Sequence, residues 1–363
     1  MRRASMGLLV IGLIGGAVWR AWPRERLLTE VAHPVAHADF KKTTACWLSV
    51  HQLLLVTTSQ EVNLADNMVR KDWRGSADVL DTTTHVTTHL DGLTRLLNRI
   101  PKDPMHGPEE FESSPDGTWI LWETNSGGDG WPWPHAAHPD GTHACDWRDN
   151  GNEEKFFIDS NQLVHLSRHA GMMVLDMASK EDHHPQKAQT QAILARYALR
   201  HPRFVRVPDA EEVAGKGFAE IALYRTQDRL QRIESEESAT LKSPVPLWAW
   251  RLNLPEGTTY QHAEASQEQQ TVLYDLTTSR LPTLFAWLHR VYPRFDPEPT
   301  FSEELWVARA DGQGRHKIGF VPTLLDEHSN PVTLLQEVRW LPDGKRISFI
   351  YRDTLYVVPA EPE

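Results

Sequence analysis

The chain has 363 residues, of which 40% are hydrophobic and 24% charged, so it can bury a sizeable core as ordinary folded proteins do. Its formal net charge is -11 at pH 7 and it shows no basic stripe, which argues against a nucleic-acid-binding protein. The two cysteines, Cys46 and Cys145, belong to no CxxC pair, which argues against a zinc or redox motif. Two buried thiols are the favoured interpretation, and one long-range disulfide in an exported domain is the alternative.

The N-terminus carries the pattern of an export signal. Arg2 and Arg3 precede the uncharged run Met6–Trp19, which is shorter than the roughly 20 residues that span a membrane. No small-x-small cleavage site follows the run directly. We therefore expect residues 1–22 to form a hydrophobic helix that acts as an uncleaved signal anchor. A cleaved signal peptide and a buried N-terminal helix are the alternatives.

This interpretation sets the compartment and the domain boundaries. Residues 23–32 are expected to be a tether and residues 33–363 to be the folded domain. With the anchor retained, the chain sits in the cell membrane by its N-terminal segment, with its bulk periplasmic or extracellular. With the anchor cleaved, the chain is secreted.

From Thr43 onward the sequence consists of short β-rich runs separated by turn residues. An Asp-Gly turn is expected at Leu90–Leu93, a glycine loop at Asn125–Gly130, a Trp-Pro-Trp-Pro loop at 131–134 and a short helix at Gln189–Leu199. Residues 231–240 suit either a strand or a loop, and residues 281–299 suit an irregular insertion. Strands are expected at 45–49, 52–58, 77–85, 118–123, 142–147, 155–160, 162–167, 171–177, 204–207, 219–224, 248–253, 272–276 and 304–310.

One turn motif recurs along the chain. Pro-Asp-Gly occurs at 115–117, 139–141 and 342–344, and Pro-Glu-Gly occurs at 255–257. Proline presets φ at the first corner, aspartate accepts a hydrogen bond from the backbone ahead, and glycine takes the positive φ that closes the turn. Several copies, each followed by an alternating strand with aromatic residues, predict a repeated antiparallel β architecture.

The copies resemble a known repeat. Ser114–Trp122, Leu341–Phe349 and Leu305–Gly312 are similar to the TolB-like, or WD-repeat-like, β-propeller repeat. The resemblance implies an all-β fold of four-stranded blades around a central channel. We count about six blades, with five to seven allowed.

The last repeat, Val338–Pro359, contains three strands and lacks a fourth. We expect residues near 33–42 to supply the outer strand and to close the ring, which removes an open sheet edge. Deletion of residues 30–43 should then destabilise the whole domain.

Candidate sites are few. Trp131, Trp133 and His135 follow a glycine-rich loop and could form a binding hot spot for a partner or stack on a sugar. The alternative is that these tryptophans pack between blades. His85 and His89 are four apart in a strand-like run, which does not predict a metal site. No Gly-x-Ser-x-Gly elbow is present, and we expect no catalytic residue, metal or cofactor.

The sequence therefore predicts a non-enzymatic, exported or membrane-tethered β-propeller that is an interaction platform, with a protein partner at a propeller face. A propeller enzyme, such as a lyase or hydrolase with a channel-lined site, and a small-ligand sensor are the alternatives. A cluster of ionisable side chains converging on the axis would favour the enzyme.

Overall fold

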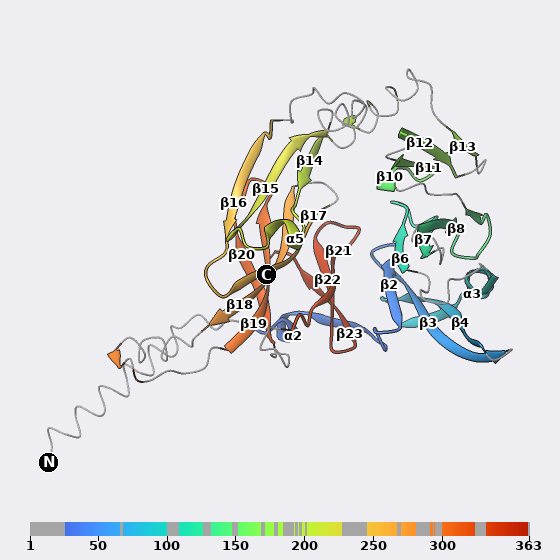
Figure 1. Ribbon diagram of the computed structural model, residues 1–363, viewed down its shortest axis with the longest axis horizontal. Helices are drawn as coiled ribbons and strands as arrows, with labels where there is room; N and C mark the ends of the chain where they lie inside the picture. The colour runs from blue at the N-terminus through green and yellow to red at the C-terminus, as the bar shows by residue number, and fades with distance from the viewer. Residues whose placement is uncertain are drawn as a thin grey trace, which may run out of the picture.

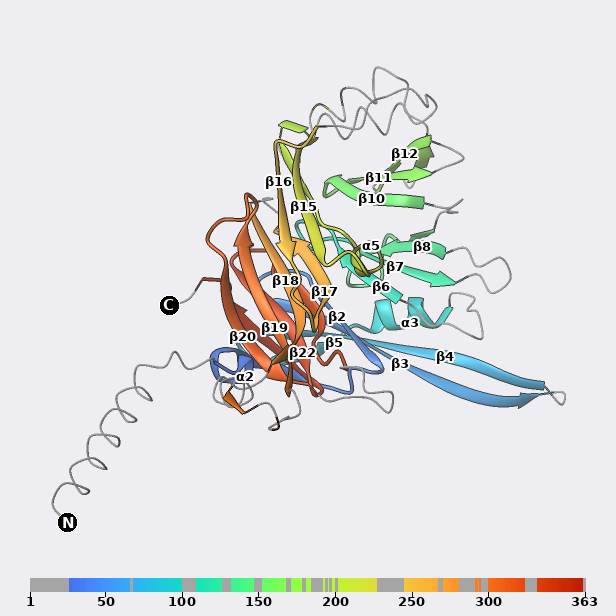
Figure 2. The ribbon, with the colours of Figure 1, turned by 60° about the vertical axis from the view of Figure 1, so that its left-hand side comes forward.

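The strands form six antiparallel sheets that follow one another around a common centre (Figures 1 and 2). Among the described residues, five of these sheets have four strands and one has three. The computed structural model describes residues 26–65, 68–99, 109–125, 132–146, 152–167, 171–177, 181–183, 192, 195, 198–199, 202–226, 245–266, 270–280, 291–292, 294, 300–323 and 332–361.

The sheets are numbered by the chain order of their innermost strands, β2, β6, β10, β14, β17 and β21. The first contains β2 (Thr43–Trp47), β3 (Gln52–Ala65), β4 (Met68–Asp81) and β5 (Val86–His89). The second contains β6 (Glu109–Ser113), β7 (Ile120–Asn125), β8 (Pro132–Ala137) and β9 (Cys145–Asp146). The third contains β10 (Asn152–Asp159), β11 (Gln162–Ser167), β12 (Gly171–Asp176) and β13 (Glu181–His183).

The second half of the chain forms the other three sheets. The fourth contains β14 (Arg203–Arg206), β15 (Phe218–Arg225) and β16 (Trp248–Asn253). The fifth contains β17 (Thr258–Ala265), β18 (Thr271–Arg280), β19 (Thr300–Arg309) and β20 (His316–Pro322). The sixth contains β21 (Gln336–Trp340), β22 (Arg346–Tyr351), β23 (Thr354–Pro359) and β1 (His33–His37). The short helices are α2 (Leu28–Val31), α3 (Asp91–Arg99) and α5 (Ala210–Val213).

This topology confirms the predicted all-β propeller, because each sheet is an antiparallel meander of neighbouring strands. The number of sheets lies within the predicted range of five to seven blades. The three strands predicted in Val338–Pro359 are β21, β22 and β23. Each sheet presents its first strand to the centre, so the side chains that can meet at the axis come from β2, β6, β10, β14, β17 and β21 (Figure 1).

The Pro-Asp-Gly turns behave as their chemistry predicts. Oδ1 of Asp116 accepts a hydrogen bond from the Thr118 backbone N–H at 3.0 Å, and Asp343 accepts one from Lys345 at 2.9 Å. Gly117 has a φ of 71°, and a Cβ atom there would lie 2.2 Å from the carbonyl oxygen of Leu48. Any other residue at this corner would therefore clash with the backbone of the first sheet.

The described N-terminal residues contact two sheets, the fifth and the sixth. Leu28 in α2 is fully buried and packs with Leu305 and Val321 of the fifth sheet. β1 then pairs antiparallel with β23 as the outer strand of the sixth sheet, from His33 opposite Val357 to His37 opposite Thr354. The start of the folded region thereby joins the last two sheets.

Leu90–Leu93 is not the predicted Asp-Gly turn, because α3 begins at Asp91. Leu93 and Leu97 are spaced by four residues, are fully buried and pack on β4 in one cluster with Ala77. The amide of Asn98 bonds the edge of β4, donating to the Gly75 carbonyl at 2.8 Å. The leucine spacing outweighs the turn preference of Asp-Gly, and the turn prediction was wrong.

The Trp-Pro-Trp-Pro segment at 131–134 was predicted to be a loop, yet β8 begins at Pro132. β8 pairs with β7 along its length, and among the described residues β9 pairs with His135 and Ala136. Proline is uncommon inside strands, so Pro132 and Pro134 favoured a loop where the structure has a strand.

β3 and β4 are longer than the strands predicted at 52–58 and 77–85. They pair over 14 residues each without a register shift, while β2 pairs no further than Thr57. The remainder projects as a two-stranded hairpin (Figure 2). His85 lies in a turn with a φ of 57° and His89 at the end of β5, so the two do not share one strand as predicted.

Both cysteines are free and buried, as the favoured interpretation predicted. Within the described part of the chain, no helix is long and apolar enough to cross a membrane. The expected hydrophobic helix at 1–22 lies outside the described residues, as do the segment 231–240 and most of 189–199 and 281–299.

Candidate functional site

The structure places the predicted binding residues in different surroundings. Trp131 lies outside the described residues, and the backbone of Trp133 pairs with that of Thr124 in β7. His135 is only 1% exposed; its ring stacks on Trp122 at 5.5 Å and its Nε2 atom hydrogen-bonds Oγ1 of Thr124 at 2.8 Å. His135 is thus packed inside the second sheet. A binding role for the two tryptophans stays a prediction.

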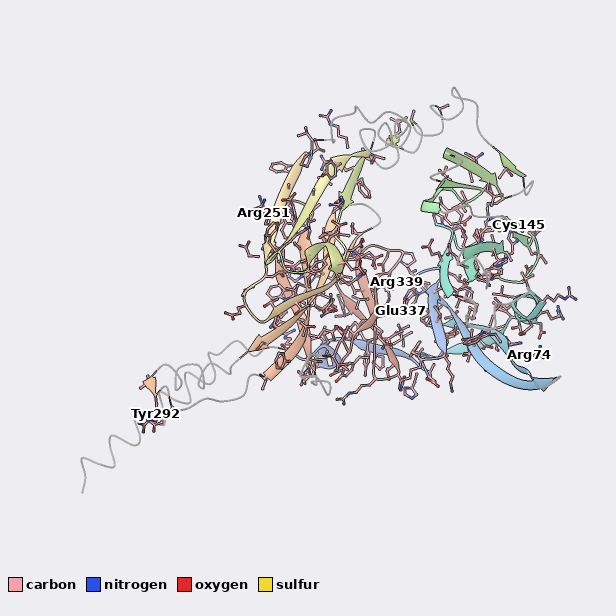
Figure 3. The ribbon with its side chains drawn as sticks, viewed as in Figure 1. Arg74, Cys145, Arg251, Tyr292, Glu337 and Arg339 are labelled. Atoms are coloured by element: carbon pink, nitrogen blue, oxygen red, sulfur yellow. The ribbon has the colours of Figure 1, made fainter. Side chains whose placement is uncertain are left out.

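A different group of ionisable side chains meets at the centre of the propeller. These residues lie on β2, β6, β17 and β21, the first strands of four sheets. We call them the axial cluster: Cys46, Glu112, His262, Glu264, Glu337 and Arg339. Figure 3 shows Glu337 and Arg339 on the side of the sixth sheet that faces the first and second sheets.

Strand alternation brings the cluster together. In β21, Val338 and Trp340 are buried in the core, so Glu337 and Arg339 point to the other face. In β17, Ala263 is buried in the same way between His262 and Glu264. Register shifts occur in β6, β17 and β21 next to these residues, and such bulges re-aim side chains.

Arg339 is the common charge of the cluster. An Nη2 atom of Arg339 lies 2.7 Å from Oε2 of Glu337. This oxygen is buried, so the contact with Arg339 is an ion pair that solvent does not reach on the glutamate side. The side chains of Arg339 and Glu337 are 43% and 35% exposed, which keeps both within reach of a ligand.

Glu264 connects the fifth sheet to the sixth, and its pKa is shifted towards neutral pH. Burial raises its pKa to about 7, against the opposing effects of the Trp340 N–H and the Arg339 charge. Its Oε2 accepts a hydrogen bond from the backbone N–H of Trp340 at 3.0 Å. The indole N–H of Trp340 in turn donates to the Glu264 carbonyl at 3.2 Å. Glu264 can therefore exchange a proton near pH 7 while it holds two sheets together.

His262 and Cys46 are held neutral. The His262 side chain is partly accessible to solvent. Desolvation by the surrounding protein, followed by the nearby Arg339 charge, lowers its pKa from the ordinary value of 6.5. It also hydrogen-bonds the backbone of Val338. Burial raises the pKa of the Cys46 thiol to about 12, which leaves no thiolate to act as a nucleophile or soft metal ligand. The cluster thus offers recognition groups and one proton-exchanging carboxyl.

A second acidic pair lies deeper in the fifth sheet. Asp275 and Glu303 are 1% and 0% exposed. Burial first, and the neighbouring Glu303 second, raise the pKa of Asp275 well above its ordinary value, so it stays protonated and donates to the Glu303 carboxylate. Oε2 of Glu303 accepts hydrogen bonds from the backbone N–H groups of Leu334 and Leu335 at 2.6 and 2.9 Å. The pair therefore has a structural role, because it holds the backbone of Leu334 and Leu335, which leads into the sixth sheet.

The sequence contained a signal for the axial cluster that was not used. His262 and Glu264, and likewise Glu337 and Arg339, are two residues apart, as side chains on one face of a strand must be. Nothing in that spacing shows that the two pairs face each other. Across the described residues, no group of three or more His, Cys, Asp or Glu side chains is arranged to hold a metal ion.

Comparisons with known proteins name no family for this chain. No family model and no curated protein matches it. Among solved structures it is similar to AtxE2 isopeptidase, with 9% identity and a TM-score of 0.42, over 91% of this chain and 50% of that one. TolB from Acinetobacter baumannii has 12% identity and a TM-score of 0.35, over 77% of this chain and 54% of that one. The β-propeller domain of the Trilobed protease from Pyrococcus furiosus has 11% identity and a TM-score of 0.34, over 91% of this chain and 84% of that one.

The chain spans only about half the length of AtxE2 isopeptidase and of TolB. The neighbours include TolB-like propellers, which is the family that the repeats resemble. All these TM-scores are below 0.5, so the fold rests on the sheet topology described above and function rests on the site.

Proposed function

We propose that this chain is a non-enzymatic β-propeller that binds a protein partner through its axial cluster, and that its N-terminal segment holds it outside the cytoplasm. A propeller supports interaction platforms in general. The observation that carries the proposal is that ionisable side chains of the first, fifth and sixth sheets share the charge of Arg339, with Glu112 of the second sheet near Cys46. Charged groups at a recognition point steer encounter and fix the register of a partner.

The chemistry of the cluster favours binding over catalysis. The Cys46 thiol is neutral, and His262 and Glu264 are engaged with the backbone of β21. Arg339, whose side chain is 43% exposed, is left to meet a ligand. The partner we expect presents a carboxylate to Arg339.

Crosslinking in intact cells tests this proposal. We expect parent protein to crosslink to a discrete partner, and Arg339→Ala to reduce the yield at least tenfold, which corresponds to about 1.4 kcal/mol. Arg251→Ala is the matched control, because Arg251 lies on β16, away from the inner strand of the fourth sheet, is 63% exposed and also contacts a glutamate, Glu220, at 3.3 Å. Equal loss in both variants, or no loss in either, would contradict a role for the axial cluster.

One observation favours a second candidate, a propeller enzyme such as a lyase or hydrolase. A carboxyl with a pKa of about 7 is suited to general acid–base catalysis at neutral pH. If Glu264 has that role, an activity found in the parent will titrate near pH 7 and vanish in Glu264→Gln. An activity that survives in Glu264→Gln would remove this candidate.

A further inference from the structure

Two histidine rings meet at the turn that joins β8 to β9. His138 follows β8 directly, and His143 lies two residues before β9. Their ring centres are 4.5 Å apart and their planes are inclined by 37°. Two imidazoles that bind one metal ion, with metal–nitrogen distances of about 2.0–2.1 Å and an angle of about 90–110° between the bonds, have ring centres about 4.5–5.2 Å apart. The separation of the two rings therefore falls at the short end of the range for two ligands of one ion.

The turn between the two rings is fixed by its backbone. The Gly141 N–H donates to the His138 carbonyl at 2.8 Å, and the His138 N–H donates to the Thr142 carbonyl at 3.0 Å. Oδ1 of Asp140 accepts a hydrogen bond from the Thr142 N–H at 2.8 Å. Gly141 packs so closely on α3 that a Cβ atom there would collide with the Gly92 backbone. Ligands that are held in place before an ion arrives bind it with little loss of conformational freedom.

The two rings are held in different ways. His138 is half-buried, and its ring makes an edge contact with Trp119, with ring centres 4.3 Å apart. His143 is exposed and has a left-handed φ of 57°. That conformation is uncommon for residues other than glycine, and such positions cluster at sites that hold ligands. One ring is therefore fixed by packing, and the other is open to an ion that arrives from solvent.

The charges around the two rings favour a cation. Burial first, and the neighbouring His143 second, lower the pKa of His138 from 6.5, which leaves its ring neutral at pH 7 with a lone pair to donate. The charge of Asp140 acts on both rings, and the charge of Asp116 acts on His138. Neutral imidazoles near carboxylates suit a divalent ion of intermediate softness, such as Zn²⁺.

We propose that His138 and His143 together bind one divalent transition-metal ion, with Zn²⁺ as the representative. The two rings are the ligands that the described residues provide, and the other positions of the ion are open to further donors, water included. The sequence predicted no metal, because a spacing of five residues across a turn belongs to none of the common metal motifs. Neither histidine belongs to the axial cluster, and the inference does not rest on the proposed function.

The test uses the full chain, freed of metal, with Zn²⁺ alone as the probe in equilibrium dialysis. His143→Asn removes the imidazole and keeps a residue type that tolerates the left-handed φ, so the turn is retained. His85→Asn is the matched control, because His85 is also exposed and also has a φ of 57°. The chain has 18 histidines, so the control also measures Zn²⁺ bound elsewhere. We expect one equivalent of Zn²⁺ to bind the parent and His85→Asn with the same affinity, and His143→Asn to bind it at least tenfold more weakly.

A second variant and a spectrum separate metal binding from ring packing. His138→Phe keeps an aromatic ring against Trp119 and removes both ring nitrogens, so it should lose the ion as His143→Asn does. With Cu²⁺ in place of Zn²⁺, electron paramagnetic resonance should show coupling to two imidazole nitrogens in the parent and to fewer in each variant. No saturable Zn²⁺ binding in the parent, undiminished binding in His143→Asn, or an equal loss in His85→Asn would each overturn the proposal. The crosslinking test of Arg339 is scored separately.

Discussion

Leu28→Ala tests whether the N-terminal segment is part of the folded propeller. Leu28 is fully buried against the fifth sheet, and a Cβ atom placed on Gly319 would come within 3.0 Å of its Cδ2 atom. So tight a site cannot collapse easily around a smaller side chain. We expect the substitution to lower the free energy of unfolding by about 2–5 kcal/mol, from lost burial plus the cavity left behind.

Urea denaturation followed by tryptophan fluorescence measures this loss. Leu247→Ala is the control, because Leu247 is 40% exposed and its truncation should change stability by no more than about 0.5 kcal/mol. A loss below about 1 kcal/mol for Leu28→Ala would show that α2 does not dock as described. Deletion of residues 30–43, which removes β1 and bares the edge of β23, should cost more than Leu28→Ala.

Three further outcomes are expected. In the folded chain the pKa of Asp275 is raised well above 3.8, its ordinary value in the unfolded chain. The folded chain therefore holds a proton that the unfolded chain releases, and the free energy of unfolding should fall as pH rises from 3.8 through the folded-state pKa. Asp275→Asn should flatten that slope in denaturation curves at pH 5 and 8. Thiol reagents should label Cys46 and Cys145 only on unfolding, and rapid labelling of the native chain would contradict their burial. If Trp131 and Trp133 bind a partner, replacing both with Ala should abolish capture without lowering the melting temperature; loss of the fold instead would mean that they pack in it.

Local chemistry explains which elements could be predicted. The Pro-Asp-Gly turns and the strands of Val338–Pro359 depend on neighbours in the sequence, and they are found as predicted. The strand at Pro132–Ala137 depends on its pairing with β7 along its whole length, which its two prolines do not indicate. No local pattern contains that information.

The axial cluster shows the same limit more sharply. Glu337 adopts a left-handed φ of 49° beside a register shift, a conformation that its residue type does not favour. The contact of Glu337 with Arg339 depends on that local backbone conformation. The approach of His262 depends on how the fifth sheet packs against the sixth. The sequence shows the charged pairs but not their convergence, which is why the site was missed.

The pairing of β1 with β23 has a consequence for how the protein is made. His37 and Thr354, which share a hydrogen bond of 3.0 Å, are 317 residues apart in the chain. During synthesis β1 therefore leaves the ribosome long before β23 is made. The nascent chain must carry an unpaired strand while the other five sheets are synthesised, and contacts so distant in sequence slow folding. A chain released before β23 is made would leave β1 without its partner strand.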